Sequence, residues 1–318
     1  MIILRFLLLY SLFSCFVLGS DSLSIGFWNI ENLFDLENDP SIRDDEFAIG
    51  GKKNVTRDIY ELKIERSVEV LTDLNVDILG LCEVENISVL IELNNSYKGR
   101  DYKIIHFDSP DERGIDNALL YDPKKFELIS SKPIVNFLGG DDKTRDILYV
   151  KGTFNRSLIH IFVNHWPSNY GGKKKAMPKR NSTARLLMAE VEQIRRIEEE
   201  PNIILLGDFN EDPDEQNVEL LGNIGLTSLM ADMVGKNGIS TYIYRGTDYL
   251  YDQIIVSEEV LDKKGMTIAE SSLYILDLPK YRQQEGKYKN YPFRFWAGDR
   301  LLGGYSDHLA IKVDLILN

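Results

Sequence analysis

Short apolar runs bounded by turn residues recur along the chain and predict a protein rich in β-strands. Their length and their content of β-branched residues are typical of strands. The predicted strands cover residues 23–28, 76–81, 102–107, 118–121, 126–135, 147–154, 158–164, 203–206, 253–256 and 309–315. The runs 118–121 and 126–135 are joined through Asp122-Pro123, which predicts a β-hairpin.

Helical periodicity is less frequent. It is carried by Tyr60, Ile64, Leu71 and Leu74 after an N-cap at Thr56, and by Leu187, Val191 and Ile194 after Asn181-Ser182. Many strands with a few amphipathic helices favour an α/β protein with two packed sheets and helices outside them. The polar stretches near 36–57, 168–182 and 279–304 are predicted loops, and no repeat or long linker divides the chain. We therefore expect one domain over residues 21–318.

The first 20 residues have the layout of a secretory signal peptide. Arg5 precedes the apolar run 6–18, and the small pair Gly19-Ser20 follows it. The alternatives are a buried strand or a membrane anchor, but the run is short for a bilayer span. Lipoprotein anchoring at Cys15 is not expected, because the apolar run continues past it. The sequence thus predicts a secreted or periplasmic protein with a signal peptide over residues 1–20.

Composition narrows the class of protein. Of the 318 residues 43% are hydrophobic and 27% charged, and the formal net charge is −13, which indicates a globular acidic chain. Such a chain does not bind nucleic acid or anionic membrane through its net charge, so any phosphate must be bound by a local metal ion or basic loop. Cleavage after residue 20 would leave Cys82 as the single cysteine, without an intrachain disulfide. We expect a soluble monomer without stable membrane insertion of the mature chain.

Several predicted strands end in chemically active side chains. Asp208 and Asn210 follow the buried run 203–206, and such a pair can orient a water beside a phosphoryl group. His165 ends another strand, and Asp307-His308 precedes the last one. Turn-rich loops are the alternative interpretation of each motif taken alone. His106 and His160 lie within strand patterns and are interpreted as packed or surface residues.

Carboxylate and amide oxygens also follow the first two predicted strands. Asn29 and Glu31 follow one, and Glu83 follows the other. These are ligands that a hard cation such as Mg²⁺ takes, whereas a Zn²⁺ site is not expected without paired cysteines or histidines. The alternative for Glu31 is solvated surface charge, and Glu85 is interpreted in that way.

The ordered set of motifs resembles the endonuclease/exonuclease/phosphatase superfamily, the metal-dependent phosphodiesterases related to DNase I. The resemblance covers residues 23–317 and rests on these blocks: Trp28-Asn29-Ile30-Glu31-Asn32, Leu81-Cys82-Glu83-Val84-Glu85-Asn86, Arg113-Gly114-Ile115-Asp116, Asn164-His165-Trp166-Pro167-Ser168, Gly207-Asp208-Phe209-Asn210, Tyr251-Asp252-Gln253-Ile254-Ile255-Val256-Ser257 and Ser306-Asp307-His308. Each block alone is weak, and their order carries the resemblance.

The resemblance implies a four-layered α/β sandwich, with two mixed, mainly antiparallel sheets and helices on the outer faces. It also implies the roles of the site residues. The metal would be held by Glu83, with Asn29, Glu31 and Asp307 near it. Asp208 and Asn210 would hold the attacking water and a phosphate oxygen, Asp252 would orient His308, His165 would face the phosphate, and Arg113 would bind it. Whether Asp208 or the Asp252–His308 pair removes the water's proton is left open.

Two departures from the family pattern concern contacts around this set. Cys82 stands where the family commonly has Gln, and Asn169 stands where related exported proteins often carry Arg. The first departure puts a hydrogen bond near the metal in doubt, and the second a phosphate contact.

Two locally basic loops bear on the substrate. One holds Lys173, Lys174, Lys175, Lys179 and Arg180, and the other holds Lys280, Arg282, Lys287, Lys289, Arg294 and Arg300 among aromatic residues. Such loops suit a nucleic-acid backbone, although solvated loops with packed aromatics are an equal alternative. The expected function is a secreted endonuclease acting on DNA or RNA with Mg²⁺, or with Mn²⁺ or Ca²⁺. The alternatives are a phospholipid or sphingolipid phosphodiesterase, an inositol-phosphate phosphatase, and a non-catalytic binding protein.

Overall fold

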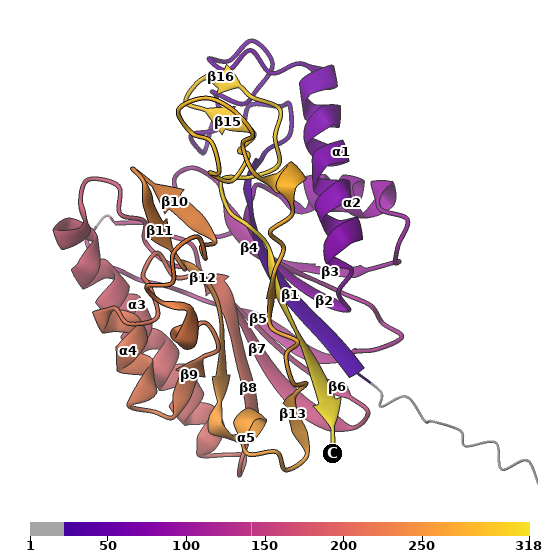
Figure 1. The fold of residues 1–318 in the computed structure, drawn as a ribbon, viewed down its shortest axis with the longest axis vertical. Coiled ribbons are helices and arrows are strands. Elements are labelled where there is room, and N and C mark those ends of the chain that lie inside the picture. The colour runs from indigo at the N-terminus through magenta and orange to yellow at the C-terminus, as the bar shows by residue number, and fades with distance from the viewer. Residues whose placement is uncertain (1–21, 141) are drawn as a thin grey trace, which may run out of the picture.

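The computed structural model describes residues 22–140 and 142–318 (Figure 1). The predicted signal segment and Cys15 lie outside the described residues. The first elements are β1 (Ser22–Leu33), α1 (Arg57–Leu74), β2 (Ile78–Val84), α2 (Ile87–Ser96), β3 (Lys103–His106), β4 (Asp116–Tyr121), β5 (Glu127–Ile134), β6 (Ile147–Phe154), β7 (Ser157–His165) and α3 (Lys173–Arg195). The remaining elements are β8 (Asn202–Asp208), α4 (Gln216–Gly222), β9 (Leu226–Ser228), β10 (Tyr242–Tyr244), β11 (Thr247–Tyr249), β12 (Asp252–Ser257), α5 (Glu258–Leu261), β13 (Met266–Ile268), β14 (Tyr274–Ile275), β15 (Trp296–Ala297), β16 (Arg300–Leu301) and β17 (Ile311–Leu317), with short 3₁₀ turns at Ala231–Met233 and Pro279–Tyr281.

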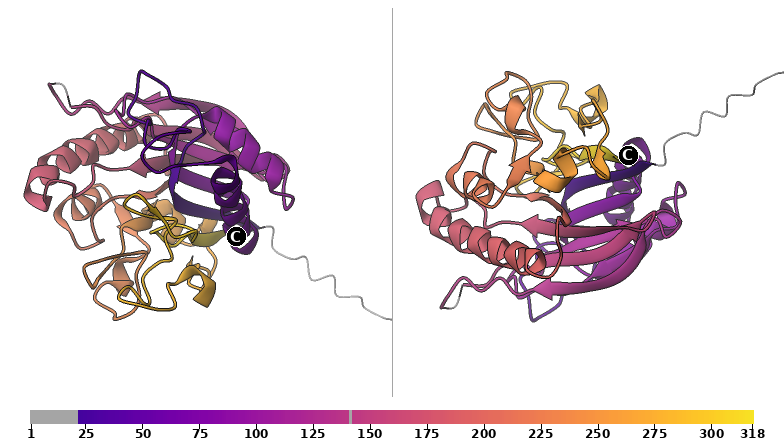
Figure 2. Two further views of the ribbon diagram at one scale, coloured as in Figure 1. Left: turned by 90° about the horizontal axis from the view of Figure 1, so that it is seen from above. Right: turned by 90° about the horizontal axis from the view of Figure 1, so that it is seen from below.

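The larger strands form two mixed sheets that pack face to face. One has the order β13-β17-β1-β2-β4-β3, and the other has the order β5-β6-β7-β8-β12-β9. The pairs β1–β2 and β7–β8 are parallel, whereas the other neighbours in these two sheets are antiparallel. Viewed from above, α1 lies outside one sheet and α3 outside the other (Figure 2). The predicted four-layered α/β sandwich is confirmed.

Three apolar clusters correspond to the interfaces between the layers. The cluster between the sheets contains Phe27, Leu119 and Val163, with residues from both sheets. A second cluster joins the first sheet to α1 and α2, and a third joins the second sheet to α3 and α4. Burial of these apolar surfaces is the main stabilising contribution to the fold.

Helix α1 begins where its sequence predicts. The Thr56 hydroxyl accepts a hydrogen bond from the Ile59 N–H, which satisfies one of the free donors at the helix start. The predicted apolar residues Tyr60, Ile64, Leu71 and Leu74 are buried against the first sheet. No helix within the described ranges combines the length and apolar character that crossing a membrane requires.

The predicted hairpin at Asp122-Pro123 is wrong. Strand β4 pairs with β2 and β3, whereas β5 pairs with β6 in the other sheet, so the turn carries the chain from one sheet to the other. Tyr121 and Phe126 flank the turn and pack edge to face at 5.5 Å, and both belong to the cluster between the sheets. The turn residues Asp122-Pro123 suit a hairpin within one sheet and a crossing between the two sheets equally well. Burial of the two rings between the sheets favours the crossing.

The predicted loop over 168–182 is also partly wrong, because α3 begins at Lys173 rather than after Asn181-Ser182. The helix includes Pro178, which cannot donate a backbone hydrogen bond and therefore argues locally against helix. Burial of Ala176 and Arg180 fixes this first part of the helix against the protein body. Packing thus outweighs the local preference.

Candidate active site

Most of the chemically active side chains lie at the ends of β1, β2, β7, β8 and β12. Parallel pairing places His165 of β7 beside Asp208 of β8, and Asn29 of β1 beside Cys82 of β2. Antiparallel pairing places Asp252 opposite Asp208. The register of the strands therefore brings side chains from distant motifs to one edge of both sheets.

Asp208 lies at the centre of the group. Its Oδ2 accepts a hydrogen bond from Asn29 Nδ2 at 3.1 Å, which joins the two sheets, and its Oδ1 accepts one from the Asn210 N–H at 3.0 Å. Burial raises the pKa of Asp208 to about 6, although the nearby His308 favours the ionised form. Above this pH the carboxylate can accept a proton from a bound water.

His308 is held by a buried carboxylate. Its Nδ1 lies 2.7 Å from Asp252 Oδ2, and its Nε2 lies 3.8 Å from Asp208 Oδ2. Burial opposes the charge of the imidazole, but Asp252 and Asp208 outweigh it and raise the pKa of His308 well above its usual value. Tyr242 stacks on the ring with centroids 4.7 Å apart. The charged form of the imidazole is therefore favoured, and its orientation is fixed.

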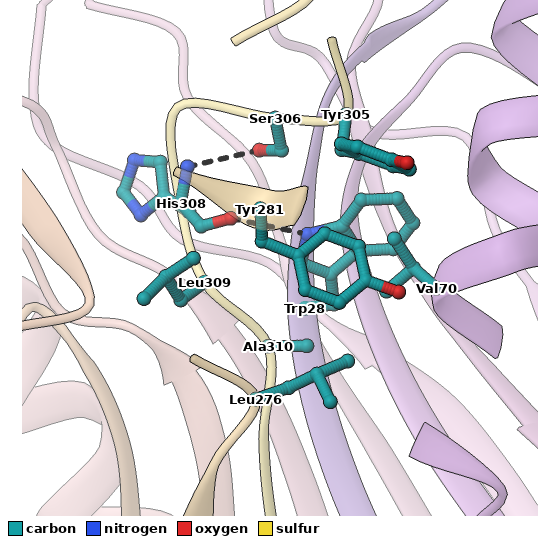
Figure 3. Close-up of a pocket in the computed structure, with 9 residues that line it drawn as sticks. All are labelled: Trp28, Val70, Leu276, Tyr281, Tyr305, Ser306, His308, Leu309 and Ala310. Atoms are coloured by element: carbon teal, nitrogen blue, oxygen red, sulfur yellow. Dashed lines mark hydrogen bonds between the residues drawn. The ribbon is translucent and has the colours of Figure 1, made fainter. Parts of the chain in front are cut away.

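Figure 3 shows how the turn that carries His308 is fixed. The His308 N–H donates to Ser306 Oγ at 3.0 Å, and its carbonyl accepts from Trp28 Nε1 at 3.3 Å. A small cavity lies against this turn, lined in part by Tyr281 and Tyr305. The imidazole of His308 points away from Trp28, so the cavity contacts the support of the histidine rather than its reactive edge.

His165 also lies close to Asp208. Its Nε2 lies 3.7 Å from Asp208 Oδ2 and 4.0 Å from Glu83 Oε1. Burial and the charge of Arg145 lower the pKa of His165 well below its usual value. Two imidazoles therefore flank one carboxylate, and only His308 is favoured in the charged form.

The expected metal ligands are more dispersed. Glu83, in a left-handed backbone conformation with φ 62°, accepts a hydrogen bond from the Asn32 N–H through Oε2. Both oxygens of Glu31 accept backbone N–H groups, from Phe295 and Trp296. Burial and then Asp307 raise the pKa of Glu31 to about 7. Glu31 therefore has its hydrogen-bonding capacity partly used, whereas Glu83 Oε1 accepts no hydrogen bond from the described residues.

Arg294 bridges two of these acids. Its Nη2 donates to Asp307 Oδ2 at 2.6 Å, and its Nε lies 3.7 Å from Glu31 Oε1. Among the described residues, Asp208, Asp252 and His308 form one of two carboxylate–histidine clusters whose ligand atoms all lie within 4.8 Å, and the other is His106, Asp108 and Asp116. Glu31, Glu83 and Asp307 form no such cluster. Their hard oxygen atoms nevertheless fit a cation such as Mg²⁺, which takes few protein ligands and keeps several waters.

Arg113 and Asn169 occupy the rim of the site. Arg113 Nη2 donates to Asn32 Oδ1 and lies 3.9 Å from Glu83 Oε2, with its side chain 46% exposed and so open to a ligand. Asn169 Nδ2 donates to the Asn210 carbonyl at 3.1 Å and to the Tyr251 hydroxyl at 3.2 Å. Asn169 thus supports the site loops instead of presenting a cation.

Sequence reasoning missed three buried groups around the site. Lys63 on α1 donates to the carbonyls of Ile30 and Tyr305, and burial lowers its pKa to about 8. Lys63 lies seven and eight residues before Val70 and Leu71, a spacing that places it on the buried face of α1 and was a usable signal of burial. Arg145 lies in the loop that precedes β6 and donates to the Trp166 carbonyl and to Asp111. No local sequence pattern predicts its burial.

The third missed group is Glu85, and its interpretation as solvated charge is wrong. The residue is 7% exposed. Burial raises its pKa to about 8, although the hydrogen bond from the Asp35 N–H opposes this shift, and the charges of Asp35 and Asp44 add to it. The loop that follows β1 covers this side chain, and a motif read locally does not reveal that cover.

The two basic loops differ in how far their basic side chains are exposed and free to bind a ligand. In the second, Lys280, Arg282 and Arg294 form ion pairs with acids, while Tyr281, Phe295 and Trp296 are buried, so these residues pack and pair. In the first, Lys174 and Lys175 are exposed. Tyr170, just before them, is 95% exposed, and Tyr244 in the β10–β11 hairpin is 50% exposed.

Comparison with known proteins gives a family match and several similar folds. The sequence profile of the Endonuclease/Exonuclease/phosphatase family matches residues 24–316. Similar solved structures include D. rerio TDP2 complexed with single strand DNA product, at 14% identity and TM-score 0.59, covering 92% of this chain and 98% of that chain. The human nocturnin catalytic domain with bound sulfate has 18% identity and TM-score 0.56, covering 93% and 95%.

A phosphatase has the same degree of similarity. Bacteroides thetaiotaomicron mannosyl-6-phosphatase has 18% identity and TM-score 0.57, covering 92% of this chain and 99% of that chain. At these identities the similarity shows the fold. No curated protein sequence matches the chain.

Proposed function

Because the chain belongs to the endonuclease/exonuclease/phosphatase family, whose members hydrolyse phosphate esters, we propose that it is a divalent-metal-dependent nuclease acting on DNA or RNA. The observation that carries the hydrolytic part is the buried Asp252–His308 pair, whose imidazole lies close to Asp208, with His165 also close to that carboxylate. A phosphodiester resists attack because its negative charge repels the nucleophile. A charged imidazole and a bound cation reduce that repulsion.

In the proposed mechanism each side chain has a distinct task. Asp208, with a pKa of about 6, accepts the proton of the attacking water. Asn210 keeps that carboxylate in place, because its N–H donates to Asp208 Oδ1 while its Nδ2 donates to the Trp166 carbonyl. The charged His308 binds a phosphate oxygen, and Asp252 keeps the imidazole oriented. Glu83, with Asn29, Glu31 and Asp307 around it, would hold Mg²⁺, which would neutralise charge at the phosphate and on the leaving oxygen as the P–O bond breaks. Arg113 binds the phosphate at the rim.

The preference for nucleic acid is supported by the exposed residues beside the site. Tyr170 and Tyr244 offer rings on which bases can stack, a contact worth about 1–3 kcal/mol per base. Lys174 and Lys175 offer charge to the backbone. We also propose that the enzyme acts as a monomer after export, with residues 1–20 removed. N-terminal sequencing and size-exclusion chromatography of the exported protein test these two points.

The test of function is a substrate panel with and without metal. Purified enzyme is incubated with single-stranded DNA, plasmid DNA, RNA, sphingomyelin, inositol phosphates and a sugar phosphate, each with Mg²⁺ and with excess chelator. We expect cleavage of nucleic acid that chelation abolishes, and fragment lengths show whether cutting is internal. Turnover of another substrate without nucleic-acid cleavage would reject the nuclease proposal. Full activity after chelation would reject the proposal that hydrolysis requires a divalent metal.

Arg294→Met is expected to tighten binding of Mg²⁺ or Mn²⁺ by about three- to tenfold, because it removes a positive charge from two proposed metal ligands. Isothermal titration calorimetry measures the Kd. Arg294→Lys keeps the charge, and Arg300→Met removes an exposed charge from the same loop. Arg294→Met binding no more tightly than these controls would contradict the expectation.

A further inference from the structure

Lys63 is a buried charge that the proposed mechanism does not use. The residue lies in the first half of α1 and is 4% exposed. Its ammonium donates to the Ile30 carbonyl at 2.6 Å and to the Tyr305 carbonyl at 3.0 Å, and it lies 4.8 Å from the centroid of the Phe295 ring. A charged group is buried only where other contacts replace the lost water, and here two backbone carbonyls do so.

The first of these carbonyls belongs to an irregular part of β1. The pairing of β1 with β2 shifts register between Asn29 and Leu33, and Glu31 in this interval has a left-handed backbone with φ 57°. Such a conformation is unfavourable for residues other than glycine and persists where surrounding contacts hold it. A bulge of this kind also redirects side chains beside an active site. The hydrogen bond from Lys63 to Ile30 holds the bulge at the residue before Glu31.

The second carbonyl belongs to the turn that carries Asp307. Tyr305 precedes Ser306, and the Ser306 hydroxyl donates to the Asn29 carbonyl at 2.7 Å. Lys63 therefore forms a second link between the same two segments, directly beside the first. One ammonium that donates to both carbonyls keeps the bulge and the turn at a fixed separation. The two segments that bear proposed metal ligands are thus joined at adjacent residues.

We propose that Lys63 is a positioning residue for hydrolysis of the phosphate ester. Its ammonium holds the bulge of β1 against the turn before Asp307, so that Glu31 and Asp307 keep the relative positions that cation binding requires. Lys63 acts through the backbone and transfers no proton. This inference rests on the proposed function.

The charge of Lys63 by itself would have the opposite effect on the affinity for a cation. Burial lowers the pKa of Lys63 to about 8, and the charges of Glu31, Asp307 and Glu83 oppose this shift, so these acids interact with the ammonium. A positive charge near metal ligands weakens cation binding, as expected for Arg294. If Lys63 were only a charge, its removal would tighten cation binding. If Lys63 positions the ligands, its removal weakens cation binding.

Lys63→Met keeps an apolar side chain of similar length and removes both hydrogen bonds together with the charge. We expect it to weaken Mn²⁺ binding by about tenfold, measured by isothermal titration calorimetry. At saturating Mg²⁺ and below the Tm, it should lower kcat by about 10- to 100-fold and change KM by less than about threefold, because displaced groups impair the chemical step. Lys63→Gln keeps an amide donor and should show smaller losses of both.

Lys312→Met is the matched control. Lys312 is a half-buried lysine of β17 that donates to the carbonyl of Leu74, the last residue of α1, at 3.0 Å. It holds the opposite end of the same helix, so its removal should leave kcat and the Mn²⁺ Kd within about twofold of wild type.

Three results would overturn the proposal. Tighter Mn²⁺ binding by Lys63→Met would show that Lys63 acts only as a charge. A lower Tm with kcat, KM and Kd within about twofold of wild type would assign Lys63 to the stability of the fold. Loss of the folded state in both Lys63 variants would lead to the same conclusion. If wild type turns over no substrate, the proposed function fails, and the Mn²⁺ affinities still decide whether Lys63 positions the ligands.

Discussion

The His308→Ala substitution is expected to lower kcat on the best nucleic-acid substrate by about 10²- to 10³-fold, the range found for removal of one donor that stabilises charge developing in the transition state. The variant loses a charged imidazole that Asp252 holds at 2.7 Å and that lies 3.8 Å from Asp208. KM should change less than kcat, because the charge is most useful when negative charge develops on the phosphate. Steady-state kinetics with Mg²⁺ measures both constants.

Two further variants separate chemistry from folding. Asp252→Asn keeps the shape of the residue but removes its charge, and should lose much of the same kcat. His160→Gln changes another buried histidine of β7, which contacts Tyr149 and Glu198, and should leave kcat within about twofold of wild type because that residue lies outside the site. If His308→Ala and His160→Gln have similar kcat values, His308 has no catalytic role.

The Glu211→Gln substitution is expected to lower the free energy of unfolding by about 3–5 kcal/mol, because it leaves Arg180 charged and buried without its counter-ion. Both side chains of this pair are 0% exposed, and Arg180 Nε donates to Glu211 Oε1 at 2.8 Å. Glu211 also accepts from Asn217, and Arg180 also donates to the Pro167 carbonyl and to Asn169 Oδ1. Urea unfolding followed by tryptophan fluorescence measures the loss.

A matched exposed pair provides the control. Lys132 Nζ lies 2.8 Å from Glu190 Oε2, with the lysine side chain 51% exposed, so Glu190→Gln should cost less than about 1 kcal/mol. The double variant Arg180→Met/Glu211→Leu should recover part of the lost stability, because it removes both charges. Equal losses in Glu211→Gln and Glu190→Gln would show that burial of the pair has no energetic consequence.

Much of the fold follows from local patterns. The apolar runs become the strands of both sheets, and Thr56 caps α1 at the predicted place. The start of α3 and the connection after β4 were mispredicted, because each depends on a contact with a distant segment. Arg180 at the start of α3 is buried against Glu211, and Tyr121 before the connection belongs to the core between the sheets.

By itself the sequence determined the layered fold and the chemistry at the strand ends, such as Asp208 and His308. Alternation of apolar residues and the turn residues after them are local properties, and strand ends of packed sheets necessarily meet. Only the tertiary structure decided which charges are buried and with what partner, as for Lys63, Arg294 and Glu85. The physical reason is that the free energy of a charge depends on the segments that exclude water from it, and these segments are remote in sequence.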